Sequence, residues 1–128
     1  NALAIDAAIA AFTQGDEWLD ALRAYIAENR LTVKEFLERE MENVTLVPSH
    51  ATYLLWLDCR RVIGDAVELC RYLRSETGLY LSAGSTYGGN GNQFLRMNIA
   101  CPNARIADGL GRLKAGVEAY ERYVAESC

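Results

Sequence analysis

The stretch "GNQFLRMNIACP", residues 91–102, carries the pattern that decides the fold. Its alternate residues divide into two sets. One set is apolar: Leu95, Met97, Ile99 and Cys101. The other set is mixed: Phe94, Arg96, Asn98 and Ala100. Because successive side chains of a strand point to opposite sides, this pattern predicts a strand with one dry face. Arg96 then lies on the other face, where its charged guanidinium requires a polar partner.

The segments around this strand predict helices packed on a small sheet. Helical patterns cover residues 3–12 and 16–43, run from Asp65 to Gly78, and resume after Asn103. Further strands are predicted over 44–47, 51–59 and 79–81; the apolar run "ATYLLWLDC" (51–59) favours burial on both faces. The order α-α-β-β-α-β-β-α predicts an α+β fold, in which helices cover a small, largely antiparallel sheet preceded by a long connecting helix.

Composition narrows the class of protein. The chain has 128 residues, which suits one domain with a sizeable core. Its net charge of −4 argues against a nucleic-acid or anionic-membrane partner, since either would favour a basic patch. No apolar run approaches the roughly 20 residues that span a bilayer. The sequence therefore predicts an ordinary globular domain with no nucleic acid and no membrane among its partners.

The four cysteines form no CxxC pair, and His50 is the only histidine of the chain. This spacing favours free thiols in a cytoplasmic protein, where a reduced cysteine acts as a small hydrophobic residue. A disulfide framework or a zinc site is the alternative.

Arg96 is the first candidate for binding, because its planar fork of donors suits bidentate capture of a carboxylate or phosphate. Asn98 shares its face, and the glycine-rich loop "SAGSTYGGNGNQ" (82–93) offers Ser85 and Tyr87 beside it. The alternative is an edge-strand arginine that pairs with a nearby acid. A phosphate cradle in the loop is less favoured, because no Lys-Ser or Lys-Thr pair follows and the next element is a strand.

Other polar residues suggest structural roles. His50 is expected in a turn, and Asp58 is expected to pair with Arg60 or Arg61 rather than to act as an acid or base. The only two lysines, Lys34 and Lys114, fall on exposed helix faces, unlike the desolvated lysine that forms a Schiff base. No catalytic residue and no metal ligand is predicted.

Three segments together resemble a known family. They are "PSHATYLLWLDCR" (48–60), "GLYLSAGSTYG" (78–88) and "FLRMNIACP" (94–102). In this order and spacing they are similar to the C-terminal small domain of fold-type-I pyridoxal-phosphate enzymes, most like the MalY/PatB cystathionine β-lyase branch. The resemblance implies that residues 1–15 end a large-domain helix and linker, 16–43 form the connecting helix, and 44–128 form the C-terminal small domain.

The resemblance also implies a function. The parent would be a cytoplasmic homodimer of amino-acid metabolism that uses pyridoxal 5′-phosphate as an electron sink. It would remove the α-proton of a sulfur amino acid and release a β-thiol, leaving pyruvate and ammonia. Arg96 would hold the α-carboxylate of the substrate, with Asn98, Tyr87 and Ser85 near it. The alternatives are the small domain of a class I or II aminotransferase, or a stand-alone amino-acid-binding regulatory or structural α+β domain.

The chain departs from the family in one respect. The family's cofactor lysine, the aspartate facing the pyridine nitrogen and the phosphate-binding residues belong to the large domain, and none of them is in this sequence. We therefore expect the chain alone to be inactive and to bind no cofactor. Its expected partner is an N-terminal large domain.

Overall fold

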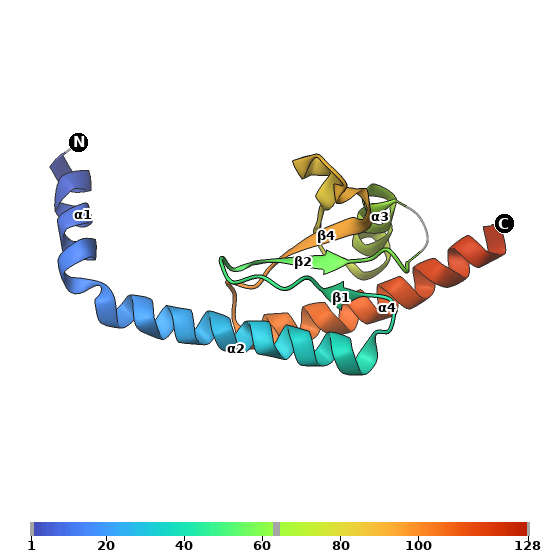
Figure 1. Ribbon diagram of the computed structural model, residues 1–128, viewed down its shortest axis with the longest axis horizontal. Coiled ribbons are helices and arrows are strands. Elements are labelled where there is room, and N and C mark those ends of the chain that lie inside the picture. The colour runs from blue at the N-terminus through green and yellow to red at the C-terminus, as the bar shows by residue number, and fades with distance from the viewer. Residues whose placement is uncertain (1, 63–64, 128) are drawn as a thin grey trace.

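The computed structural model describes residues 2–62 and 65–127 (Figure 1). The helices are α1 (Ala2–Gln14), α2 (Asp16–Glu40), α3 (Ala66–Thr77) and α4 (Asn103–Ser127). The strands are β1 (Thr45–Leu46), β2 (Leu54–Asp58), β3 (Ser82–Ala83) and β4 (Phe94–Asn98). Two short 3₁₀ turns, η1 (Gly84–Tyr87) and η2 (Gly91–Gln93), lie between β3 and β4. The predicted order of helices and strands is confirmed.

The four strands form one sheet in the order β1-β2-β4-β3. Every pair of neighbours is antiparallel. β4 therefore lies inside the sheet, between β2 and β3. In this register Arg96 faces Trp56 on β2 and Ser82 on β3. The predicted α+β class with a small antiparallel sheet is confirmed.

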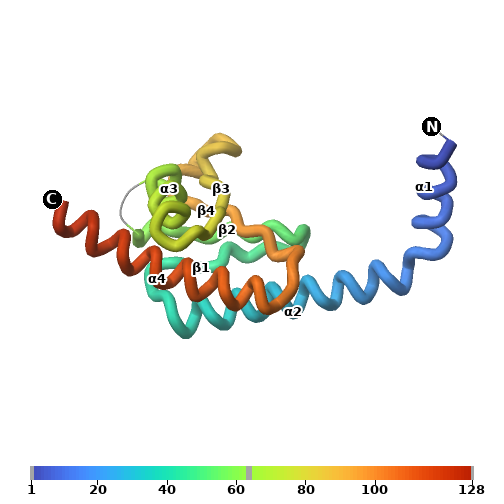
Figure 2. Tube along the Cα trace, turned by 180° about the vertical axis from the view of Figure 1, so that it is seen from behind, coloured from blue at the N-terminus to red at the C-terminus, as the bar shows by residue number. Residues whose placement is uncertain are grey.

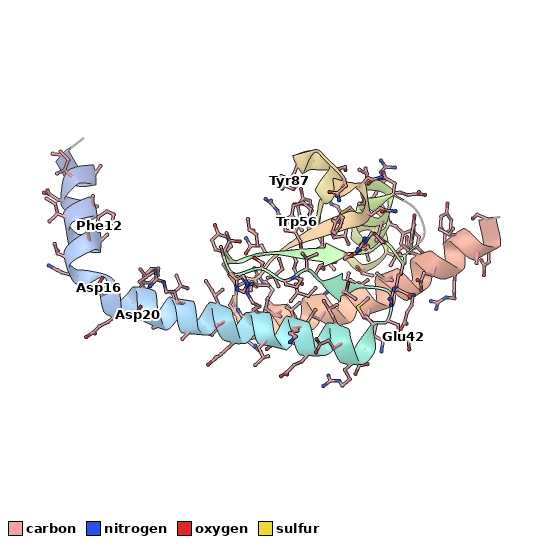
Figure 3. All side chains as sticks on the ribbon, viewed as in Figure 1. Phe12, Asp16, Asp20, Glu42, Trp56 and Tyr87 are labelled. Carbon is pink, nitrogen blue, oxygen red and sulfur yellow. The ribbon has the colours of Figure 1, made fainter. Side chains whose placement is uncertain are left out.

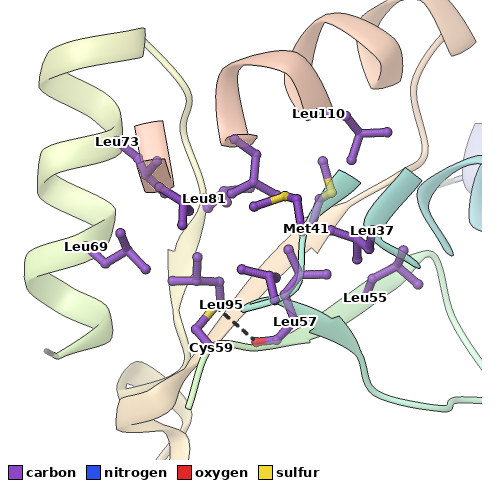
Figure 4. Close-up of a cluster of buried hydrophobic side chains, with 14 of the residues drawn as sticks. Leu37, Met41, Leu55, Leu57, Cys59, Leu69, Leu73, Leu81, Leu95 and Leu110 are labelled. Carbon is purple, nitrogen blue, oxygen red and sulfur yellow. Dashed lines mark hydrogen bonds between the residues drawn. The ribbon is translucent and has the colours of Figure 1, made fainter. Parts of the chain in front are cut away.

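The apolar face of the sheet packs against the helices. Leu55 and Leu57 of β2 and Leu95 of β4 are fully buried, and Met97 is nearly so. They share one hydrophobic cluster with side chains of α2, α3 and α4 (Figure 4). The dry face inferred from the alternation around Arg96 is thus confirmed, with Ile99 also fully buried.

Two details of the strands differ from the prediction. β2 is buried on one face only, because Leu54, Trp56 and Asp58 are half-buried while the residues between them are buried. The helices cover only one face of the sheet. The other face, which carries Leu54 and Trp56, is also apolar in β2 but is only partly covered. β3 lies at 82–83 rather than 79–81, since Ser82 and Ala83 are the residues that pair with β4.

The long helix α2 ends at Glu40 and has two different halves. In its C-terminal half Asn29, Val33 and Leu37 are buried against the rest of the fold. In its N-terminal half Trp18 is 70% exposed. α1 continues away from the sheet at an angle and has no buried residue, as the two opposite views show (Figures 1 and 2). The residues packed around the sheet therefore begin in the middle of α2.

Two short connections show why the chain turns where it does. α3 ends at Thr77 and is capped by Gly78, whose φ of 71° is the left-handed conformation that glycine adopts without strain. At the other end of the sheet, Asn29 donates hydrogen bonds to the carbonyls of Ile99 (2.9 Å) and Cys101 (3.0 Å). These bonds fasten the chain that leaves β4 to the middle of α2.

Candidate functional site

The candidate site lies on the face of the sheet that the helices leave uncovered. Ser82, Arg96 and Trp56 form a row across β3, β4 and β2, because directly opposed residues of antiparallel strands project to the same side. Phe94 lies two residues from Arg96 and so shares this face. Figure 3 shows Trp56 and Tyr87 together on this side, away from α2. This face therefore brings Arg96 together with the aromatic rings of Trp56, Phe94 and Tyr87.

Arg96 is half-buried and stacks on Tyr87. Its guanidinium carbon lies 4.4 Å from the centre of the Tyr87 ring. Within residues 2–62 and 65–127, no carboxylate lies within ion-pair distance of Arg96. Stacking occupies the flat face of a guanidinium and leaves the N–H groups along its edge to bind a carboxylate. The alternative of an edge-strand arginine paired with an acid is therefore wrong here, since β4 is an interior strand.

The turns that carry Tyr87 are fixed by two buried glycines. Gly84 in η1 and Gly91 in η2 pack backbone against backbone. A Cβ atom on Gly84 would also lie 2.7 Å from the Trp56 ring. Only a residue without a side chain allows this approach. The close packing seats the loop on Trp56 and places Tyr87 over Arg96.

Three aromatic rings form a wall next to the arginine. Trp56 contacts Tyr87 and Phe94 edge to face, with ring centres 5.7 and 6.0 Å apart. A pocket of about 280 Å³ opens beside these rings and is lined by Val47, Trp56, Tyr87, Gly88, Asn90, Gly91 and Phe94. Among residues 2–62 and 65–127, no charged side chain lines this pocket. Tyr87 thus links the two features: its side chain lines the pocket, and its ring also stacks on the Arg96 guanidinium.

The other predicted site residues contribute less. Asn98 is on the same face as Arg96 but is exposed, and its Oδ1 accepts a hydrogen bond from the Ala100 N–H at 2.8 Å. The Ser85 carbonyl accepts the Gly88 N–H, and the Gly88 carbonyl accepts the Gly91 N–H. Since these amides are bonded inside the loop, they form no phosphate cradle. The structure brings Arg96 and Tyr87 together, and it uses Asn98 to shape the turn after β4.

Sequence reasoning missed Trp56 and Ser82 as neighbours of Arg96. The signal for Trp56 was present, because the strand 54–58 alternates in the same way as 94–98. What single strands do not reveal is the register that sets Trp56 opposite Arg96. Ser82 was assigned to the loop and lies instead in β3.

Asp58, Lys114 and Lys34 are engaged in structural contacts. Arg60 donates to the Asp58 carboxylate at 2.6 Å and holds the pKa of that carboxyl below its usual value. Lys114 binds Glu40 at 2.8 Å, which raises the pKa of the lysine; Lys34 lies 3.8 Å from Glu38. The predicted ion pair of Asp58 is confirmed.

The thiols of Cys59 and Cys70 have pKa values raised by burial to about 12 and about 11. Among the cysteines that the structure describes, Cys59, Cys70 and Cys101 are free. In the same part of the chain, no group of histidine, cysteine or acidic side chains could hold a metal ion.

A larger groove of about 780 Å³ lies between α2 and the segment around β1. Its lining is mainly apolar, and its two arginines are already bonded. Arg30 donates to the carbonyls of Ser49 and Thr52, and Arg61 donates to the carbonyl of Glu42. The groove therefore offers a charged ligand fewer unpaired donor groups than the face around Arg96 does.

Comparison with known proteins identifies the family. Residues 2–113 match the model of the family described as "Aminotransferase class I and II". The chain belongs to this family. The resemblance inferred from the three sequence segments is thus confirmed.

Within residues 2–62 and 65–127, none of the helices combines the length and apolar character needed to cross a bilayer.

Relatives within this family include two curated proteins. The chain is 36% identical over 117 residues to cystathionine beta-lyase PatB of Bacillus subtilis, which covers 91% of the chain and 30% of PatB. It is 33% identical over 119 residues to protein MalY of Escherichia coli, covering 93% of the chain and 30% of MalY. The chain therefore spans about 30% of the length of these relatives.

Solved structures of this family confirm the fold. The chain superposes on cystalysin from Treponema denticola with a TM-score of 0.80 and 26% identity. The match covers 85% of this chain and 28% of cystalysin. The cystalysin structure contains a pyridoxal 5′-phosphate cofactor.

Proposed function

We propose that this chain is the C-terminal, substrate-binding part of a longer pyridoxal-phosphate-dependent C–S β-lyase. The observation that carries the proposal is Arg96, a half-buried arginine on an interior strand that stacks on Tyr87 and has no acidic partner in residues 2–62 and 65–127. Its free edge suits the α-carboxylate of an amino acid. The lyase assignment is supported by the likeness to PatB, and the substrates would be sulfur amino acids.

The proposal includes a division of the chain and a missing partner. Residues 1–15 would belong to the end of a large domain, 16–43 would connect the domains, and 44–128 would form the small domain. The exposed apolar side chains of α1, such as Phe12 at 87%, support a partner beyond this chain. So does the chain's coverage of only about 30% of its relatives. Following the family resemblance, we also propose a cytoplasmic homodimer for the full-length protein.

The described residues fit the carboxylate end of such a site and do not fit the cofactor. Lys34 and Lys114 lie beside carboxylates, and the amides of Gly88 and Gly91 are bonded inside their own loop. The cofactor would be held by the rest of the protein, where it supplies an electron sink. The part of this chain is to fix the amino acid by its carboxylate, which sets the orientation of the remaining bonds.

Substitution of Arg96 in the full-length protein tests the proposal. We expect Arg96→Ala to lower kcat/KM for S-benzyl-L-cysteine by about a hundredfold, because a charge-assisted bidentate contact is lost. Arg96→Lys should recover only part of this, since lysine lacks the planar fork. S-benzylcysteamine, which has no carboxylate, should be an equally poor substrate for the wild type and both variants. Arg105→Ala, at an exposed position of α4, is the matched control.

Two results would overturn the carboxylate role. One is an Arg96→Ala enzyme that handles amino acids like the wild type. The other is a loss of equal size for Arg105→Ala. The products separate the lyase from the aminotransferase alternative. A lyase releases pyruvate and ammonia without an added oxo acid, whereas an aminotransferase requires an oxo-acid acceptor.

The isolated chain separates the remaining alternative, a stand-alone amino-acid-binding regulatory or structural domain. We expect it to show no lyase activity, no stoichiometric pyridoxal phosphate and no measurable heat on titration with amino acids. Cofactor bound to Lys34 or Lys114, or tight binding of an amino acid, would contradict this expectation. Absorbance spectroscopy and calorimetry make both measurements.

A further inference from the structure

The pocket beside Arg96 is a second recognition element that the carboxylate contact does not use. It holds about 280 Å³ and is bordered by three aromatic rings, those of Trp56, Tyr87 and Phe94. Val47 adds an apolar side chain, and none of the described residues that line the pocket is charged. Its walls thus favour an uncharged, apolar group.

The position of the pocket relative to Arg96 is fixed by the sheet. Trp56 is the residue directly opposite Arg96 on the neighbouring strand, and such pairs have Cβ atoms about 4.5–5.5 Å apart. Tyr87 contacts both Arg96 and Trp56. A molecule whose carboxylate meets the edge of Arg96 therefore has the aromatic wall within reach of its side chain.

The walls of this pocket pack closely against one another. Gly84 lies against the Trp56 ring and against Gly91, so the loop that carries Tyr87 has no space to settle closer. Phe94 also packs edge to face against Trp56. A preformed aromatic pocket binds an apolar group without a large cost for ordering its walls.

We propose that this pocket selects the side chain of the amino-acid substrate and favours bulky thioether or aromatic groups over charged ones. The inference rests on the proposed function, because it takes Arg96 as the carboxylate contact. Trp56 is the residue that determines this preference. Sulfur and aromatic groups both gain from contact with aromatic rings. A carboxylate in the same pocket would lose its hydration and find no cation among the described residues that line it. Arg60, whose guanidinium carbon lies 6.0 Å from the centre of the Phe94 ring, is already paired with Asp58.

The test compares two substrates that share a cysteine core. S-benzyl-L-cysteine carries an apolar ring, and S-carboxymethyl-L-cysteine carries a charge. Consumption of each amino acid is measured with the full-length protein, whatever the product, to obtain kcat/KM. We expect Trp56→Ala to lower kcat/KM for the benzyl substrate by roughly ten- to a hundredfold and for the carboxymethyl substrate by less than about threefold. Trp56→Phe should retain most of the preference.

Two further variants control for misfolding and for changes in activity that do not depend on the pocket. Val47→Phe fills the pocket from its rim and removes none of its walls, so it should weaken the benzyl substrate alone. Trp18→Ala removes a tryptophan that is 70% exposed on α2, far from the pocket, and should leave the ratio of the two substrates unchanged.

The outcomes distinguish this inference from the function on which it rests. If Trp56→Ala and Val47→Phe change both substrates equally, or change neither, the pocket does not select side chains while the role of Arg96 stands. If the wild-type protein consumes neither amino acid, the proposed function fails and the inference fails with it. A change in the ratio confined to the two pocket variants supports the inference.

Discussion

Arg96 lies with its guanidinium carbon 4.4 Å from the centre of the Tyr87 ring, and the ring itself rests against Trp56. The guanidinium is therefore oriented by stacking of its flat face on the Tyr87 ring, and not by an ion pair. An acid in contact with Arg96 would compete with a ligand for the same N–H groups. An aromatic ring does not compete, because it occupies the face and leaves the edge for binding.

Removal of the Tyr87 ring should loosen this orientation. In the full-length enzyme of the proposed function, we expect Tyr87→Leu to raise KM for amino acids about two- to fivefold, as loss of an exposed cation–π contact implies. Tyr87→Phe keeps the ring and should behave like the wild type. Steady-state kinetics make the comparison. An equal defect in both variants would assign the effect to the hydroxyl and not to stacking.

Glycine substitutions should separate packing from helix propensity. A Cβ on Gly84 would lie 2.7 Å from the Trp56 ring and 2.8 Å from the Phe94 carbonyl, so Gly84→Ala should lower the free energy of unfolding by about 1–3 kcal/mol. Gly111, which is exposed within α4, has open space around its Cβ position. Gly111→Ala should instead raise that free energy by about 0.5–1 kcal/mol. Urea denaturation measures both, and destabilisation by Gly111→Ala would contradict the packing argument.

The alternation of a single strand was enough to find Arg96 and its face, but not its neighbours. Leu95, Met97 and Ile99 are buried as predicted, because apolar side chains at every second position pack on whatever covers that face. Register depends on the partner strand, so the placement of Trp56 and Ser82 opposite Arg96 was not predictable from one pattern.

The errors in β2 and β3 have related physical causes. An apolar run does not tell whether both faces of a strand are covered. Trp56 is half-buried because the helices leave its face open, and its ring packs on Tyr87 and Phe94. Leu81 is buried, as an apolar residue should be, yet the pairing with β4 begins at Ser82. Hydrophobicity accounts for the burial of Leu81, whereas backbone pairing decides where the strand lies.

The ion pair of Asp58 predicts how stability depends on pH. Arg60 lowers the pKa of Asp58 below its ordinary 3.8, chiefly through their hydrogen bond. The ionised pair therefore stabilises the fold above the unfolded pKa, and this contribution is lost as the pH falls through the lower, folded pKa. We expect the wild type to lose this stability below about pH 4, and Asp58→Asn to lack that part of the pH dependence.

Urea denaturation at pH 7, 4 and 3 checks the prediction. Asp20→Asn serves as control, because Asp20 is 75% exposed and lies 3.5 Å from the equally exposed Arg23. Exposed pairs of this kind contribute little to stability. If Asp58→Asn and Asp20→Asn follow the same pH curve as the wild type, the Asp58 pair has no such role.

Asn29 is the residue whose loss should most weaken the attachment of β4 to α2. It is 1% exposed, and its amide nitrogen donates to the carbonyls of Ile99 and Cys101. Asn29→Ala leaves the buried Ile99 carbonyl and the half-buried Cys101 carbonyl without this donor, and should cost about 1–3 kcal/mol in the free energy of unfolding. Asn92→Ala, at an exposed position in η2, is the control and should change stability little.

The variant Asn29→Asp tests the same hydrogen bonds through the pH dependence of its stability. A carboxylate has no hydrogen to donate to the carbonyls of Ile99 and Cys101, so burial there disfavours the charged form and raises the pKa of the introduced acid. Stability of this variant should then be highest below the unfolded pKa of about 3.9 and should fall as the pH rises through the folded value. Denaturation of Asn29→Asp and Asn29→Ala at pH 4 and pH 7 measures the difference. A loss for Asn29→Asp that is the same at both pH values would show that hydrogen-bond donation by residue 29 does not hold the end of β4.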